Sequence, residues 1–178
     1  MDIFTALHSR RSIRKYTEEP VAAEELRILL DAAMIAPSAG NAQPWRFVVI
    51  DDKTLLARIP AIHPYAGMAA RAPLGIVVCG DLRREKYHGF WVQDCAAATQ
   101  NLLLAATGLG LGAVWTGIYP VEDRVAAFSG LLNLPEQCVP LSLVVLGRPA
   151  MHAEARSRFD ESLVHHNTFD GRAENAQV

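Results

Sequence analysis

The residues best suited to do chemistry stand in a short basic run near the start of the chain. The run 10–15 holds three arginines, one lysine and the hydroxyl of Ser12 within six residues. Cationic groups this close repel one another unless they are solvated or meet negative charge, and the planar fork of a guanidinium suits phosphate. The run therefore predicts either a solvated helix end or a site for a small anion.

Three further segments combine polar or very small residues with a predicted strand. The loop 37–45 consists of small and amide residues between two prolines, so another group can approach its backbone closely. Gly117 ends a predicted strand with an unshielded backbone N–H, and Arg148 directly follows another. The loop and Arg148 also have plain structural explanations. Ser38 and Asn41 can serve local turn hydrogen bonds in the loop, and Arg148 can be a solvated surface residue.

Several other chemistries find no support in the sequence. The glycines of 108–112 follow a predicted helix and precede a strand, which reverses the order of a dinucleotide-binding loop. Metalloprotease, paired Cys-x-x-Cys, phosphate-loop and Gly-x-Ser-x-Gly motifs are absent. His165 and His166 are adjacent, so their side chains diverge, and no metal site is expected.

Composition describes an ordinary globular protein with no general affinity for nucleic acid. Of 178 residues, 51% are hydrophobic and 20% are charged, and the net charge is -2. Nucleic-acid binding would need a broad positive surface, and no apolar stretch is long enough to span a membrane. We expect a cytoplasmic protein whose three cysteines are reduced thiols in the core.

The helices and strands that position these residues are predicted from the spacing of hydrophobic residues and from the prolines and glycines that end each segment. Helices are predicted over 3–9, 21–36, 52–59, 64–70, 91–107 and 121–128, and buried strands over 46–50, 73–80, 113–116 and 140–146. The polar stretch after residue 150 has no core pattern of its own. We therefore expect one domain over 1–150 and an arm over 151–178.

Four segments together resemble the flavin-dependent nitroreductase family. They read Arg-Arg-Ser-Ile-Arg-Lys-Tyr near the start, Ala-Pro-Ser-Ala-Gly-Asn-Ala-Gln-Pro-Trp before the first strand, Gly-Leu-Gly-Ala-Val-Trp-Thr-Gly in the centre and Leu-Gly-Arg-Pro towards the end. They stand in the order of the family and cover nearly the whole chain.

The resemblance implies a fold, a cofactor and an assembly. The fold would be α+β, with a central mixed sheet flanked by helices. The protein would be a homodimer with one FMN at each subunit interface and with the C-terminal arm packed on the partner. NADH or NADPH would donate a hydride to FMN, and a nitroaromatic or quinone-like small molecule would then accept the electrons.

The resemblance also implies roles for particular residues. The FMN phosphate would be held by Arg10, Ser12 and Arg148, with Arg11 lining the same site. Arg14 would face the pyrimidine edge of the flavin, where a fixed cation stabilises the charge of the reduced ring. The other subunit would contact the flavin through Pro37, Ser38, Ala39 and Asn41, and Gly117 would offer its backbone N–H to flavin N5, with Thr116 beside it.

Other positions and functions stay open at this point. His63, Tyr65 and Arg71 are candidates for polar contacts to the ribityl chain, and Tyr65 and Trp91 either border a substrate channel or pack in the core or an interface. An enzyme of the same fold could instead reduce free flavin or a halogenated aromatic, and a flavin carrier or sensor would need no turnover.

Overall fold

Four antiparallel strands make one sheet in the described part of the chain. The computed structural model describes residues 1–155 and 158–169. The strands are β1 (Trp45–Ile50), β2 (Leu74–Asp81), β3 (Gly112–Gly117) and β4 (Cys138–Gly147). They lie in the order β1-β2-β4-β3, so β1 and β3 are the outer strands.

The expectation of a mixed sheet is wrong for these strands, because each neighbouring pair is antiparallel. In the described ranges, parallel pairing is confined to an isolated bridge between Ser12 and Ala113 at the outer side of β3. Continuous apolar strands indicate that both faces of a sheet are covered, but this pattern carries no information about strand direction.

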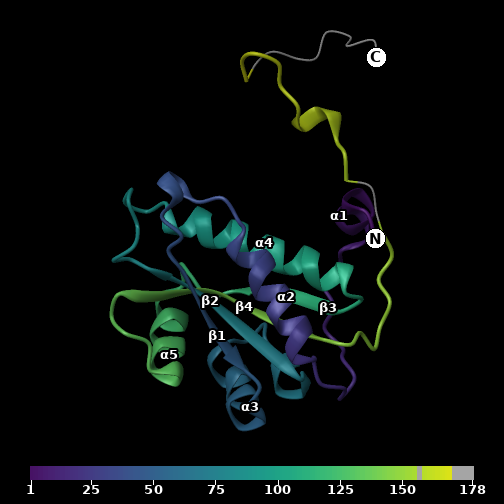
Figure 1. The fold of residues 1–178 in the computed structure, drawn as a ribbon, viewed down its shortest axis with the longest axis vertical. Coiled ribbons are helices and arrows are strands. Elements are labelled where there is room, and N and C mark those ends of the chain that lie inside the picture. Colours follow the sequence, from purple (N-terminus) through teal and green to yellow (C-terminus); the bar gives the residue numbers. More distant parts are fainter. Residues whose placement is uncertain (156–157, 170–178) are drawn as a thin grey trace.

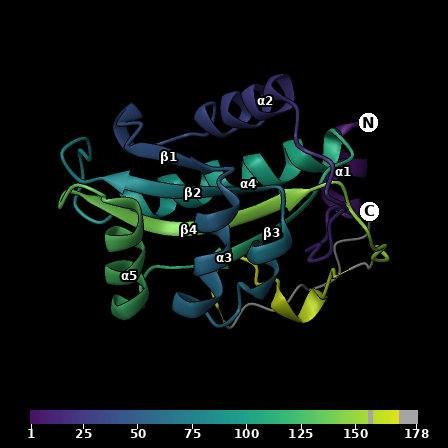
Figure 2. The ribbon, with the colours of Figure 1, turned by 90° about the horizontal axis from the view of Figure 1, so that it is seen from below.

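Helices cover both faces of the sheet, as Figure 2 shows from below. One core lies under α2 (Ala23–Met34) and α4 (Trp91–Gly108), where Leu29 and Leu102 meet Ile76 of β2. The second core lies under α3 (Lys53–Ile62), the short helix η2 (Gly67–Arg71) and α5 (Glu122–Leu132). Successive residues of β2 alternate between the two cores, which explains why this strand is buried along its whole length.

The helix ends follow from local sequence chemistry. Asp2 caps α1 (Ile3–Ser9) by accepting the N–H of Thr5 at 3.0 Å, as its position predicts. Asp52 caps α3 through the N–H of Thr54 at 2.7 Å, and Asn133 ends α5 in the left-handed conformation. The expected helices and strands are thus present, with ends that differ by a few residues.

The three cysteines are free and buried, which confirms the expectation of reduced core thiols. Burial raises the pKa of Cys95 to about 12, so this thiol is protonated near neutral pH. In the part of the chain that the structure describes, no helix is long and apolar enough to span a membrane.

The chain after β4 passes the basic run and then leaves the body of the molecule. Figure 1 shows this segment, with the short helix η3 (Glu161–Leu163), extending away from the sheet. Phe159, Leu163 and Phe169 are at least three-quarters exposed on it. Residues 156, 157 and 170–178 of the expected arm lie outside the described residues.

Candidate functional site

The basic run lies along the outer edge of β3. Arg10 is the C-cap of α1, and the chain then turns so that Ser12 pairs with Ala113 and the N–H of Ile13 donates to the carbonyl of Ala113 at 3.0 Å. Ile13 is buried against Gly112, where a β-carbon would lie 2.6 Å from its Cγ2 atom. The glycine therefore lets the run approach β3 closely.

The cations of the run gather with a further arginine from the C-terminal segment. Partial burial lowers the pKa of Arg10, and the nearby charges of Arg11 and Arg158 lower it further. Arg11 Nε donates to the carbonyl of Glu154 at 2.7 Å, which ties the C-terminal segment to the run. Like charges held together in this way favour an anionic ligand over a fully solvated helix end.

Arg14 faces a separate hollow beside the run. Its Nη1 atom donates to the carbonyl of Ser12 at 3.4 Å, and the side chain is otherwise exposed. A surface cavity of about 390 Å³ is lined by Arg14, Lys15, Tyr16, Met68, Arg71 and Ala150. Three cations thus border this cavity, which suits a ligand edge that gathers negative charge.

Gly117 turns its backbone polar groups towards the same open edge. The N–H of Ile118 donates across the ladder to the carbonyl of Leu141 at 3.0 Å, so the N–H and C=O of Gly117 point away from β4. Ala113, four residues earlier, has the same orientation, because its carbonyl accepts from Ile13. At roughly 3.3 Å per residue, the two positions lie about 13 Å apart on one strand edge.

The surroundings of Gly117 leave room for another molecule. A β-carbon on Gly117 would meet nothing closer than a carbonyl 4.0 Å away, so packing within this chain does not require the glycine. Thr116, expected beside it, is buried and donates its hydroxyl to the carbonyl of Leu143 at 3.1 Å. Its side chain is therefore committed to the sheet.

Two side chains hold the carbonyl of Gly117. His63 Nε2 lies 2.9 Å from this oxygen and Arg124 Nη1 lies 3.0 Å from it. The guanidinium of Arg124 also stands over the ring of Tyr65 at 5.5 Å, and Tyr65 is 72% exposed. Tyr65 therefore borders the site and is not a core residue, whereas His63 is buried and bound to Gly117.

The loop before β1 has a fixed and uncommon backbone. Gly40, Asn41 and Gln43 all have positive φ angles, of 57°, 53° and 48°. The hydroxyl of Ser38 accepts the N–H of Gln43 at 3.0 Å, which confirms the turn interpretation for this residue. Exposed Pro37 and Asn41 and half-buried Ser38 and Ala39 lie on a rigid turn.

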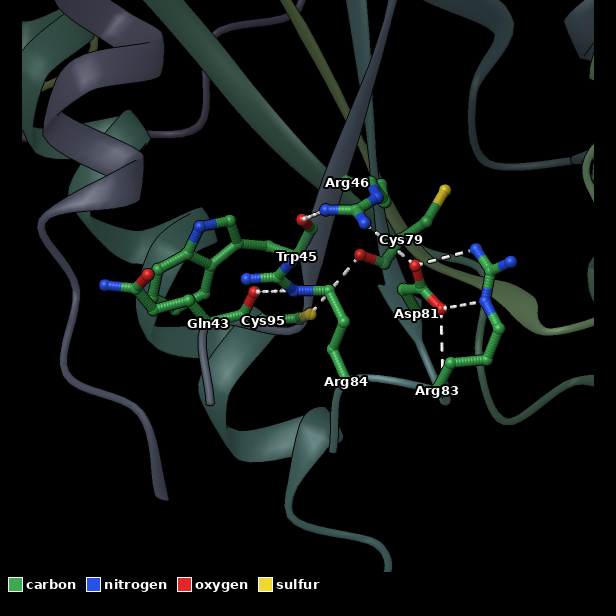
Figure 3. A network of polar contacts seen from close by, with 8 residues as sticks. All are labelled: Gln43, Trp45, Arg46, Cys79, Asp81, Arg83, Arg84 and Cys95. Atoms are coloured by element: carbon green, nitrogen blue, oxygen red, sulfur yellow. Dashed lines mark hydrogen bonds and ion pairs between the residues drawn. The ribbon is translucent and has the colours of Figure 1, made fainter. Parts of the chain in front are cut away.

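Contacts from α4 and from the chain after β2 hold this loop in place. The buried carboxylate of Asp94 accepts the N–H of Ala39 at 2.9 Å, and Lys86 Nζ donates to the carbonyl of Gly40 at 2.5 Å. Figure 3 shows Arg84 reaching the carbonyl of Gln43, at 3.1 Å.

The same region is anchored by a buried carboxylate at the end of β2. Asp81 accepts Arg83 Nε at 2.8 Å and pairs with Arg46 of β1 at 3.0 Å (Figure 3). Its backbone N–H donates to the carbonyl of Pro44 at 2.8 Å. The hydrogen bonds and charge of Arg83, with the charge of Arg46, hold the pKa of Asp81 below its usual value, so the anchor is ionised near neutral pH.

Arg148 is engaged by two acidic residues. Its Nε atom lies 3.0 Å from Glu19 and its Nη2 atom lies 2.8 Å from Glu25. In the predicted role as a phosphate ligand beside Arg10, the phosphate would compete with these two carboxylates for the guanidinium. These ion pairs cannot be read from sequence patterns, because the glutamates lie far from Arg148 along the chain.

Trp91 packs in the core. It is 6% exposed and stands edge-on to Tyr119, with ring centroids 5.0 Å apart. A β-carbon on Gly80 would lie 2.3 Å from its ring. Trp91 is therefore a packing residue in this chain, because the lack of a side chain at Gly80 leaves room for the indole against the sheet. Its suggested place beside a substrate channel stays a prediction.

Sequence patterns do not predict the contacts of four residues near the site. Asp94 and Arg124 stand on helices among ordinary polar residues, Arg158 stands in a polar tail, and His63 is expected from the resemblance only as a candidate for the ribityl chain. An acid in the first turn of a helix rich in alanine is a signal for Asp94. The others have no local signal, because their partners are distant in sequence.

The fold and the site together indicate what kind of ligand the protein binds. A cation cluster and an outward backbone N–H share one edge of an antiparallel sheet, and helices cover both faces. This arrangement suits an elongated ligand that is anionic at one end. In residues 1–155 and 158–169, no group of three or more His, Cys, Asp or Glu side chains is arranged to hold a metal ion.

Comparison with known proteins places the chain in one family. The sequence matches the Nitroreductase family over residues 7–62 and 63–148. A protein of Methanothermobacter thermautotrophicus with the provisional name NADH dehydrogenase/NAD(P)H nitroreductase is 49% identical over 165 residues, which cover 93% of this chain and 86% of that protein.

Solved structures agree with this match. A protein of Parabacteroides distasonis with the same provisional name has a TM-score of 0.90 and 36% identity, covering 94% of this chain and 98% of that one. A nitroreductase of Desulfovibrio desulfuricans in complex with FMN has a TM-score of 0.80 and 33% identity, covering 95% and 98%. The chain belongs to the nitroreductase family and is an oxidoreductase of that family, which confirms the resemblance.

Proposed function

We propose that the chain is an FMN-dependent oxidoreductase that takes a hydride from NADH or NADPH and passes electrons to a nitroaromatic or quinone-like acceptor. The observation that carries the proposal is the shared edge of β3, where the outward N–H of Gly117 follows the cation cluster around Arg10. The FMN complex of the Desulfovibrio relative supports the choice of cofactor.

The residues present fit FMN at both ends. Arg10 and the exposed hydroxyl of Ser12 would hold the phosphate, with Arg11 beside them and Arg158 close enough to share the charge. Arg148 would join them in competition with its ion pairs to Glu19 and Glu25. The positive field of Arg10, Arg11 and Arg158 favours a doubly charged phosphate over a neutral group.

At the other end, backbone and charge would orient the ring. Gly117 would donate its N–H to N5, and Arg14 would place a cation near the pyrimidine edge. When bound, FMN supplies hydride transfer, and the protein contributes orientation, electrostatics and an open face for two substrates in turn. The exposed ring of Tyr65 would border that face.

We propose a homodimer in which the turn 37–41 of the partner completes each site. Exposed apolar side chains on α1 and α2, among them Phe4 at 70% and Ile35 at 71%, form a surface that a second copy can cover. The arm after residue 150, with its exposed phenylalanines, would pack on the partner.

Spectroscopy of the purified protein tests the proposal. We expect a yellow protein that NADH or NADPH bleaches without oxygen and that regains its colour when a nitroaromatic or a quinone is added. A colourless protein that gains no thermal stability with added FMN would refute the flavin assignment. Bound flavin that neither nucleotide bleaches would indicate a carrier, and turnover of free flavin alone would indicate a flavin reductase.

A further inference from the structure

The carbonyl of Gly117 is held from outside the sheet by two side chains of separate helices. His63, the C-cap of α3, places Nε2 at 2.9 Å, and Arg124 in the first turn of α5 places Nη1 at 3.0 Å. The N–H of the same peptide, that of Ile118, donates to Leu141 of β4 at 3.0 Å. The peptide that joins residues 117 and 118 is therefore clamped on both sides.

The imidazole of His63 has one defined orientation. It is 1% exposed, and its Nδ1 atom accepts the backbone N–H of Tyr65 at 3.3 Å. Because Nδ1 accepts, the proton of the neutral ring stands on Nε2 and is donated to Gly117. Phe128 of α5 packs edge-on against the ring, with centroids 6.2 Å apart.

Arg124 is fixed by a second contact on its other side. Its guanidinium lies over the exposed ring of Tyr65, which is attracted to a cation through its negative face. Tyr65 also follows His63 by two residues, and its ring stands edge-on to the imidazole, with ring centroids 6.3 Å apart. The two donors to Gly117 thus support each other through Tyr65.

A glycine at a strand end needs such support. Gly117 has no side chain to restrict its backbone and no neighbouring strand on its outer side, because β3 is the outer strand of the sheet. Its N–H belongs to the preceding peptide, and the two backbone torsion angles of Gly117 relate that peptide to the one that carries the Gly117 carbonyl. Fixing this carbonyl therefore restrains the backbone on the C-terminal side of the N–H. The hydrogen bonds from His63 and Arg124 provide that restraint.

We propose that His63 and Arg124 are positioning residues. They hold the peptide that joins residues 117 and 118 at the open edge of β3 and thereby, through the backbone torsion angles of Gly117, restrict how the Gly117 N–H meets flavin N5. This inference rests on the proposed FMN function. Neither side chain needs to touch the flavin. The pair acts through one shared backbone oxygen, so loss of either donor should loosen the same peptide.

Hydrogen exchange tests the restraint without any cofactor. His63→Leu removes the imidazole donor, and Arg124→Met removes the guanidinium while keeping an unbranched side chain at a partly exposed position. In both variants we expect the amides of Ile118 and Tyr119 to exchange about tenfold faster, since a lost hydrogen bond changes the opening equilibrium by about that factor. Unchanged exchange at these amides in a folded Arg124→Met protein would overturn the inference.

A conservative variant separates positioning from general packing. His63→Gln carries an amide N–H near the place of Nε2 and should keep exchange within about threefold of wild type. Arg58→Met, on α3 beside a different surface hollow, is the matched control for loss of an arginine and should also match wild type. If His63→Gln behaves like His63→Leu, the role of His63 is packing alone and the inference fails.

Measurements on the FMN-loaded protein complete the test. We expect flavin reduction by the nicotinamide to slow about tenfold in Arg124→Met, while the Kd for FMN stays within about threefold and the visible flavin spectrum shifts. If wild type binds no FMN, the proposed function fails while the exchange experiment still decides the restraint. If wild type is reduced normally and Arg124→Met matches it in rate and spectrum, only the inference fails.

Discussion

Arg10 and Arg14 belong to one basic run, but they stand in different surroundings. Arg10 is half-buried among other arginines at the end of α1, whereas Arg14 is exposed at the cavity that it shares with Lys15 and Arg71. A cation crowded by like charges should contribute most to holding an anion. A cation beside a redox-active ring should contribute most to the charge that develops on reduction.

Substitution of these two arginines should therefore have different effects. We expect Arg10→Ala to raise the Kd for FMN about tenfold to a hundredfold, since a charge-assisted hydrogen bond to phosphate is lost. Arg14→Ala should slow flavin reduction about tenfold and change the Kd less than about threefold. Fluorescence titration and anaerobic stopped-flow absorbance measure the two quantities. Equal losses of affinity in both variants, with unchanged reduction, would contradict this division of roles.

Arg148→Ala is an informative companion variant. Because Arg148 is paired with Glu19 and Glu25, its removal should first lower the thermal stability of the free protein. A large loss of FMN affinity without a loss of stability would show that the arginine leaves its glutamates to bind phosphate.

His63 should make the stability of the fold dependent on pH. Burial and the charge of Arg124 lower the pKa of His63 from its ordinary value of 6.5, although the bond to Gly117 opposes this shift. The neutral ring is favoured in the folded state, so its contribution to stability is full above pH 6.5 and is lost as pH falls through the lower folded pKa.

Denaturant unfolding between pH 8 and pH 5 should reveal this contribution. We expect wild type to lose more stability over that interval than His63→Gln, whose amide does not titrate. Arg124 is the charged group that faces the imidazole, and Tyr65 contacts its edge, so Arg124→Met should weaken the pH dependence. If wild type and His63→Gln lose the same stability between pH 8 and pH 5, the histidine is not the source of the pH dependence.

At the scale of elements, the contact between the basic run and β3 depends on a missing side chain. A β-carbon at Gly112 would lie 2.6 Å from Cγ2 and 2.8 Å from Cβ of Ile13. Ile13 is β-branched and buried, so it cannot swing aside without moving the chain that carries Ser12. A change at Gly112 of the strand should therefore displace the cation cluster as well.

Gly112→Ala should damage both stability and cofactor binding. We expect a loss of about 2 kcal/mol in the free energy of unfolding, typical of overpacking, together with weaker FMN binding. Gly130→Ala on α5 is the matched control, because a β-carbon there meets nothing within 4 Å. Denaturant titration and FMN fluorescence check both effects. An unchanged Kd for FMN in Gly112→Ala would show that the cation cluster does not depend on the contact between the basic run and β3.

At the scale of the whole molecule, the exposed apolar residues of α1 and α2 predict a dimer. In the described chain Phe4 and Ile35 are open to solvent, and Ile35 lines a cavity of about 430 Å³ whose other lining residues come mainly from α1, α2 and α4. A monomer would leave this surface in water, at a cost proportional to its apolar area.

Phe4→Glu should therefore weaken the dimer and reduce FMN loading together, because the partner is proposed to complete each flavin site. Light scattering after size-exclusion chromatography measures the assembly, and the ratio of flavin to protein absorbance measures loading. Ala61→Glu on α3 introduces the same charge on another face and should leave both unchanged. A monomeric Phe4→Glu protein with full FMN loading would show that each chain binds flavin alone.

Much of the fold follows from sequence patterns, because they report on local chemistry and on burial. The helical spacing of apolar residues, apolar runs, a capping aspartate and prolines predict the helices and the four strands. The apolar surroundings of the cysteines place them in the core, and four segments of the sequence resemble the family. The density of cations in the run 10–15 and the unshielded N–H of Gly117 depend on residue type alone, so the sequence shows them.

Only the tertiary structure decided which of these residues meet. Strand direction is absent from a pattern of burial, so the antiparallel sheet could not be predicted from apolar runs. The pairing of Arg148 with Glu19 and Glu25, the packing of Trp91 on Gly80 and the convergence of His63 and Arg124 on Gly117 join residues far apart in sequence. Such contacts depend on the relative placement of whole elements, which is set by the packing of two cores against one sheet.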